Sequence, residues 1–582
     1  RAMPYPDVRR AVVRLFSTQA EPETLQFFHG LLQVNTATLP AIALEILLIN
    51  RYPFTPSELQ ILRGHSQAEI RALAHVAAIQ MALVESPQLG VVCPPIGQIQ
   101  TDETAAAAIV NVIATSRDRA LLPLLIWLLP QGSATLKQEV LTALTTLAQP
   151  GDRALAEVAI GELHHPEPMV RAKAFEVLGH VHWDETLDPV ATGLHDADPR
   201  VRQTAATALI AFGQAGLLVA QAHLNSPQPE TVEAAIAAIG QVRTNYASNL
   251  LFNHLLPDFQ TVNQTRKWQQ QIPQQDPRWQ PLQWAIADYH QRVIQKVLYV
   301  LSCMGHSRTV NTVNRILYTT DQQDLANAVE VLASLSDRRF VLPLMPVLEQ
   351  LATRSDAATR PEADAHWLRT KGYKLLLETL TIQDRWIQIG ALAALASIPT
   401  ALLHDPDPVV QRFVQQIFPA NDPSISPTTA CMNRLLLLKQ VALFKNLSLD
   451  QLLLIDQAIE QETVLAGTTI FAEGSWCTHF YIIADGCVRI MKTIDGQQRE
   501  LKQLTVGHHF GEIALFDDAP HWDGAIALQD TTLLKLDKNR FLNLITQRPH
   551  IMLEICRFLS QRVRETDHYH STVQLTSPLP EE

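Results

Sequence analysis

The chain reads Phe510-Gly511-Glu512-Ile513-Ala514-Leu515 and, after a short acidic loop, Pro520-His521-Trp522-Asp523-Gly524-Ala525. Runs of β-branched and aromatic residues lie upstream of these two segments, and Asp-Gly pairs at 485–486 and 495–496 separate the runs. Such runs between Asp-Gly turns are typical of antiparallel hairpins. Residues 540–565 instead repeat apolar positions at a helical spacing. This part of the sequence therefore predicts an antiparallel β domain followed by helices.

The two quoted segments resemble the phosphate-binding cassette of cyclic nucleotide-binding domains, and the resemblance extends over about residues 432–566. It implies a β-roll in which Gly511 and the backbone N–H groups of the turn after it hold a cyclic phosphate. It also implies that Glu512 binds the ribose hydroxyl. The positions that match the family pattern, or stand where its residues would be, are Gly511, Glu512, Ile513, Ala514, His521, Trp522 and Gly524.

His521 stands where the family has the arginine that pairs with the phosphate. A guanidinium is always charged and grips two phosphate oxygens, whereas an imidazole with a reference pKa of about 6.5 is mostly neutral at pH 7. Trp522 replaces a small residue, and we expect its bulk to fill part of the pocket. Tight binding of cyclic AMP is therefore not expected. We favour a degenerate cassette that serves as a structural cap or as a sensor of another small anion.

A true cyclic AMP or cyclic GMP receptor is the alternative. In that case another cation of the roll would take the place of the missing arginine. Arg499 and Lys502 are the candidates, because both lie on the strand expected just before the cassette.

The longer, N-terminal part of the chain is internally repetitive. Pro168-Met169-Val170-Arg171 recurs as Pro199-Arg200-Val201-Arg202, a weaker copy begins at Pro229, and a degenerate one lies at Glu69-Ile70-Arg71. This pattern resembles HEAT-type repeats. The resemblance implies helix pairs stacked into an α-solenoid, since one pair has too little apolar surface to be stable alone. Residues 245–295 interrupt the pattern with tryptophans among Gln and Pro. We interpret them as a long inter-helix loop, with a partner site as the alternative.

The fold class predicted is thus multidomain α plus β, with a HEAT-like α-solenoid followed by a cyclic nucleotide-binding-like antiparallel β-roll and its flanking helices. The expected boundaries are 1–416 for the solenoid, 417–431 for a proline-rich linker, 432–566 for the roll and 567–582 for a disordered tail. Prolines with Asn, Asp and Ser disfavour both helix and strand, which places the linker.

Composition excludes several functional classes. The net charge of −12 argues against a nucleic-acid surface, which needs clustered Lys and Arg. The six cysteines form no C-x-x-C pair, which argues against zinc and disulfides and favours a cytoplasmic protein. The sequence carries no nucleotide-binding P-loop, no nucleophile elbow and no H-E-x-x-H metal motif, so we expect no catalytic residues, no metal site and no enzyme activity.

The order of the two domains resembles the soluble tails of bacterial ATP/ADP translocase-type transporters. That resemblance implies attachment to, or association with, a membrane protein on the cytoplasmic face of a membrane. We interpret the chain as a regulatory or scaffold protein whose solenoid surface binds a protein partner. The alternatives are a cyclic-nucleotide receptor and the cytoplasmic regulatory part of a membrane nucleotide transporter.

Overall fold

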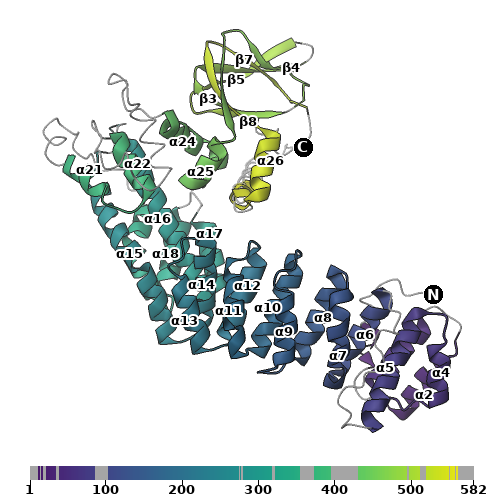
Figure 1. Cartoon of the computed structure of the whole chain (residues 1–582). Coiled ribbons are helices and arrows are strands. Elements are labelled where there is room, and N and C mark those ends of the chain that lie inside the picture. The colour runs from purple at the N-terminus through teal and green to yellow at the C-terminus, as the bar shows by residue number, and fades with distance from the viewer. Residues whose placement is uncertain are drawn as a thin grey trace, which may run out of the picture. The chain divides into compact units, whose positions relative to one another are not determined.

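The structure is a computed structural model, and its described residues form two compact units (Figure 1). The first comprises Arg1–His254 with Val300–Ser307, and the second Leu255–Tyr299 with Arg308–Glu582. The described residues are 11–13, 15–16, 21–34, 38–85, 103–273, 276, 279–317, 322–353, 373–394, 430–476, 478–494, 497–511, 520–548, 551–556 and 559–560.

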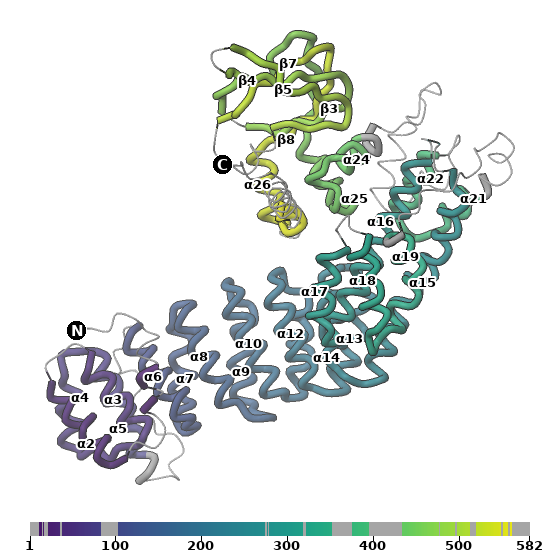
Figure 2. The backbone as a smooth tube through the Cα atoms, turned by 180° about the vertical axis from the view of Figure 1, so that it is seen from behind, coloured from purple at the N-terminus to yellow at the C-terminus, as the bar shows by residue number. Residues whose placement is uncertain are grey.

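The first unit consists of short helices stacked in a row (Figure 2). Successive helices α8, α10, α12 and α14 pack against one another, which confirms the predicted solenoid. The helices are α2 (Pro22–Leu31), α3 (Leu39–Ile49), α4 (Pro56–Arg63), α5 (Ala68–Glu85), α6 (Glu103–Ser116), α7 (Leu122–Leu128), α8 (Ala134–Leu147), α9 (Arg153–Gly161), α10 (Pro168–Val181), α11 (Leu187–Thr192), α12 (Pro199–Ile210), α13 (Gln214–His223) and α14 (Pro229–Gln241).

The repeated arginine has the same local role in each copy that carries it. Arg171 Nη1 donates to the carbonyl oxygens of His165 (2.8 Å) and Pro166 (3.1 Å) in the turn before its own helix. Arg202 does the same with Asp196 and Ala197, and Arg71 with the turn at 65–66. Carbonyls in a turn lack helical partners, so a charged donor stabilises the turn. The arginine therefore stabilises the turn in each of the three copies that carry it.

Adjacent repeats are joined by a second contact of the same arginine. Arg171 forms two hydrogen bonds with the Asp196 carboxylate, Nε to Oδ2 at 2.7 Å and Nη2 to Oδ1 at 2.8 Å. Burial alone would raise the pKa of Asp196, but these bonds hold it below its usual value. Close packing of α10 on α12 also requires Gly179, because a Cβ there would lie 2.8 Å from Ala208 Cα.

The second unit contains the rest of the helical array and the helices around the roll. The section that we predicted as a long loop is mostly helix, and that interpretation was wrong. Trp268 and Trp279 are 4% and 1% exposed, so they belong to the core. The helices are α15 (Asn245–Gln269, which begins in the first unit), α16 (Gln280–Leu301), α17 (Ser307–Ile316), α18 (Gln322–Ala333), α19 (Met345–Thr353), α21 (Tyr373–Thr379), α22 (Arg385–Ala394), α24 (Ala430–Gln440), α25 (Leu449–Asp456) and α26 (Lys538–Gln547).

The predicted antiparallel β-roll is confirmed, and it is built from two four-stranded sheets. One has the order β1-β8-β3-β6 and the other β2-β7-β4-β5. Their apolar faces share one core that includes Phe471, Tyr481, Ile490 and Phe510. The strands are β1 (Ile459–Val464), β2 (Thr469–Phe471), β3 (His479–Asp485), β4 (Cys487–Ile494), β5 (Gln497–Thr505), β6 (His509–Phe510), β7 (Gly524–Ala527) and β8 (Thr531–Asp537).

The predicted tail, 567–582, and the predicted linker up to residue 429 lie outside the described residues, and α24 begins at Ala430. Within the described ranges, no helix is both long enough and apolar enough to cross a membrane.

Candidate functional site: the cassette of the roll

Gly511 lies directly after β6, at the start of the predicted cassette. Its φ of +75° is in the left-handed region, and a Cβ there would lie 3.1 Å from the carbonyl oxygen of His479. Glycine is the residue that adopts this conformation without strain. Glu512, Ile513 and Ala514 lie outside the described residues. The structure therefore locates the cassette through Gly511 on one side and the segment from Pro520 to Gly524 on the other.

His521 points into the roll. Its ring is stacked on Phe471 of β2, with 3.6 Å between ring centroids and 7° between planes, and only 7% of the residue is exposed. Its backbone is fixed on both sides, because the N–H donates to Ser475 O and the carbonyl accepts from Gly474 N, each at 2.8 Å. Burial lowers the pKa of His521, so the ring is neutral at pH 7. In this position it is an aromatic core group rather than a cation.

Trp522 lies on the surface, and the expectation that it fills the pocket was wrong. It is 64% exposed. Its indole ring packs on the Lys492 side chain of β4 instead, because a cation over an aromatic face is favourable. Gly524 opens β7, where a Cβ would lie 3.3 Å from Glu473 N.

Lys492 of β4 lies next to the cassette and was missed by the sequence analysis. Its Nζ is 3.9 Å from the centroid of the Trp522 ring, donates to Trp522 O and lies 3.3 Å from Glu473 Oε1. The Lys492 side chain is only 18% exposed. The alternation Val488, Ile490, Lys492 along the strand was the signal that could have placed it on the inner face.

The register of β4 and β5 groups Lys492 with the two predicted substitute cations. Lys492 is opposite Arg499 and Ile490 is opposite Lys502, with an irregularity between these pairs. Residues directly opposite each other share a face, so the irregularity places Arg499 and Lys502 on the face that carries buried Ile490. Both cations are exposed, whereas Lys492 is mostly covered.

Glu473 supplies the negative charge beside Lys492. Hydrogen bonds from Thr493, whose backbone N is 2.8 Å from Glu473 Oε2, lower the pKa of Glu473, and Lys492 lowers it further. The carboxylate is therefore ionised at pH 7 and balances the lysine. An anionic ligand bound beside Lys492 would have to compete with Glu473 for the ammonium group. Among the described residues, no group of three or more His, Cys, Asp or Glu side chains could hold a metal ion.

Comparison with known proteins identifies both modules. Residues 461–548 match the family model of the cyclic nucleotide-binding domain, and residues 155–240 match that of HEAT repeats. The chain thus contains a HEAT repeat region and a C-terminal cyclic nucleotide-binding domain. For such a domain a cyclic nucleotide is the candidate ligand, and the combination of modules supports a regulatory or scaffold role.

Individual relatives are similar to part of the chain. The cyclic AMP receptor protein of Thermus thermophilus is 32% identical over 131 residues, which is 22% of this chain and 61% of that protein. The cAMP-dependent protein kinase regulatory subunit of Mucor circinelloides is 28% identical over 157 residues, 27% of this chain and 34% of the subunit. The chain therefore spans less than two thirds of the length of either relative.

Two solved structures also match less than a quarter of this chain. The N-terminal domain of a transcriptional regulator from Streptomyces coelicolor has 26% identity and a TM-score of 0.22, covering 23% of this chain and 95% of that domain. The Thermus thermophilus catabolite activator protein has 30% identity and a TM-score of 0.21, covering 23% of this chain and 63% of that protein.

Proposed function

We propose that this chain is a non-enzymatic regulatory or scaffold protein whose HEAT-type repeats bind a protein partner and whose roll does not bind cyclic nucleotides tightly. The roll acts as a structural cap or as a sensor of another small anion. The buried, neutral ring of His521 on Phe471 carries this proposal, because it stands where the family resemblance requires a phosphate-binding cation.

The charges around the cassette support the same conclusion. Lys492 is the mostly covered cation next to it and is already balanced by Glu473. A hydrogen bond to a charged group contributes about 1.5–3 kcal/mol. Loss of the arginine contact therefore corresponds to roughly a tenfold to hundredfold loss of affinity.

Calorimetric titration of the full chain with cyclic AMP and cyclic GMP tests the proposal. We expect no binding at micromolar concentrations by the wild type. A His521→Arg, Trp522→Ala double variant restores the charge and removes the indole ring that covers Lys492, so it should bind about tenfold to hundredfold more tightly. His508→Arg is the matched control, since it adds the same charge at an exposed histidine outside the cassette and should change nothing.

Micromolar binding by the wild type would contradict the proposal and favour a true cyclic-nucleotide receptor. The observation that favours this alternative is that Lys492, Arg499 and Lys502 lie on the same face of the sheet. Replacing each of the three with glutamine in turn would then identify the substitute cation, because only that change should abolish binding. The protein partner of the repeats stays a prediction from the solenoid surface. An association with a membrane nucleotide transporter on its cytoplasmic side stays a prediction from the domain order.

A further inference from the structure

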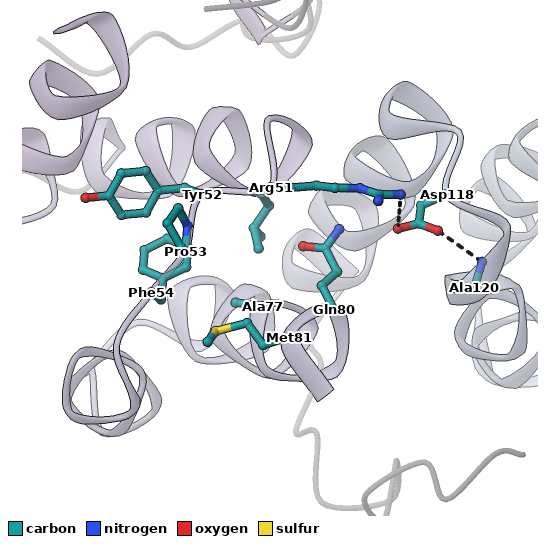
Figure 3. Close-up of a pocket in the computed structure, with 10 residues that line it drawn as sticks. Arg51, Tyr52, Pro53, Phe54, Ala77, Gln80, Met81, Asp118 and Ala120 are labelled. Atoms are coloured by element: carbon teal, nitrogen blue, oxygen red, sulfur yellow. Dashed lines mark hydrogen bonds and ion pairs between the residues drawn. The ribbon is translucent and has the colours of Figure 1, made fainter. Parts of the chain in front are cut away.

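A cavity of about 340 Å³ lies in the first unit, far along the chain from the roll (Figure 3). Its walls come from the end of α3 and the turn that follows it, from α5 and from the turn after α6. The apolar part of the lining consists mainly of Leu48, Phe54, Ala77 and Met81. Small-molecule sites have volumes of about 300–1,000 Å³, so this cavity suits a ligand of side-chain size.

Gln80 brings an unpaired hydrogen-bond donor into this apolar site. The residue is 9% exposed, and its Nε2 has no hydrogen-bond partner among the residues that the structure describes. Figure 3 shows the amide directed toward Arg51 and the open centre of the cavity. A buried N–H without an acceptor is strongly disfavoured, and such groups are rare in folded proteins. A ligand with an acceptor oxygen at this point would satisfy it.

Arg51 lies at the rim of the cavity, and its backbone is in a strained conformation. Its φ is +53°, and it follows the C-cap of α3, where glycine is the usual residue. The guanidinium reaches Asp118 at 3.0 Å, and Asp118 in turn accepts the Ala120 N–H at 3.1 Å. Non-glycine residues in this conformation cluster at ligand sites. Because Asp118 already balances the charge of Arg51, the rim favours a neutral ligand over an anion.

We propose that this cavity binds a small, neutral ligand that has an apolar part and an amide carbonyl beside it. Gln80 Nε2 donates to the carbonyl oxygen, and Leu48, Phe54, Ala77 and Met81 enclose the apolar part. The site does not depend on the function of the roll. A free small amide and a peptide segment, with its backbone carbonyl and an apolar side chain, share this chemistry.

Methyl NMR of the full chain, labelled with ¹³C-methyl methionine, tests the proposal. The chain has 8 methionines, and a Met81→Leu variant assigns the Met81 signal. We expect N-acetyl-leucinamide to shift this signal saturably with a dissociation constant of about 1 mM, as suits so small a ligand. Gln80→Leu should weaken binding about tenfold, and Gln203→Leu, at an exposed glutamine of α12, should leave it unchanged.

A second probe separates the two sources of ligand. If the blocked pentapeptide acetyl-Gly-Gly-Leu-Gly-Gly-amide binds about tenfold more tightly than N-acetyl-leucinamide, the site recognises peptides. Equal affinities indicate a free small amide. If neither probe shifts Met81, or if Gln80→Leu binds as tightly as the wild type, the proposal is wrong.

The unliganded protein provides an independent check. Removal of an unpaired buried donor should stabilise the surrounding helices, so Gln80→Leu should slow native-state hydrogen exchange in α5 by about tenfold. Faster exchange would show that Gln80 Nε2 already has a partner in solution, which would overturn the proposal even if a probe binds.

Discussion

Replacement of Arg292 by methionine is expected to destabilise the second compact unit by about 3–5 kcal/mol. Arg292 lies between two nearly buried carboxylates. Its Nε is 2.8 Å from Asp288 Oδ2, and its Nη2 is 2.8 Å from Asp384 Oδ2, whose side chains are 3% and 8% exposed. Without their shared guanidinium the two acids lose their main counter-charge inside the protein. A buried charge that loses its partner costs far more than a surface one.

The same change should also weaken the contacts that α16 and α22 make with α25, the helix just before the roll. Asp288 Oδ1 accepts the backbone N–H of Leu449 at the start of α25, at 2.9 Å. Asp384 Oδ1 accepts the Trp386 N–H at the start of α22, and the Trp386 indole donates to Asp450 Oδ1 at 2.7 Å. Arg292 therefore holds two acids that each fix the end of a helix.

Native-state hydrogen exchange of α16 and α22 measures this effect within one unit of a multidomain chain. Arg153→Met is the matched control, because Arg153 and its partner Glu157 are both exposed, and it should have no measurable effect. Burial raises the pKa of Asp288, so in the variant protonation should remove the unbalanced charge. The loss of stability should therefore become smaller as the pH is lowered from about 7 towards the unfolded pKa of an aspartate, about 3.9. A deficit below about 1 kcal/mol, or one independent of pH, would contradict this account.

The repeats and the roll could be predicted because their signals are local. The arginine at 171 and at 202 acts on the turn of its own repeat, so the residues that form the contact are neighbours in the sequence. The alternating strands and Asp-Gly turns of the roll are equally local. Each follows from the preferences of neighbouring residues, which a single sequence contains.

The features that were mispredicted or missed depend on distant parts of the chain. Trp268 is buried, and its indole N–H donates to the Glu378 carboxylate of α21, which no residue near Trp268 in the sequence indicates. Trp522 packs at the surface against Lys492 of β4, a contact with a residue distant in sequence. The unpaired donor of Gln80 could not be predicted at all, since helices carry glutamine on exposed and buried faces alike and only packing decides between them.

Acidification from about pH 7 to about pH 4 is expected to destabilise α15 and α16 through His290. His290 is 4% exposed, and its Nε2 lies 2.8 Å from Thr265 Oγ1. Burial, and to a smaller extent the charge of Arg266, lower the pKa of His290 to about 4. In the unfolded chain a histidine binds its proton near pH 6.5. The unfolded state therefore binds more protons between these values, and stability present above about pH 6.5 is lost as the pH falls, by at most about 3 kcal/mol.

Hydrogen exchange of α15 and α16, corrected for the intrinsic pH dependence of exchange, measures this loss. His290→Gln keeps a polar partner for Thr265 but cannot take up a proton, so its stability should change much less over this range. His508→Gln, at an exposed histidine, should behave like the wild type. Carboxylates held by arginine, such as Asp196 with Arg171, lose their contribution only below their unfolded pKa of about 3.9. An unchanged pH dependence in His290→Gln would therefore exclude His290 as the source without implicating these ion pairs.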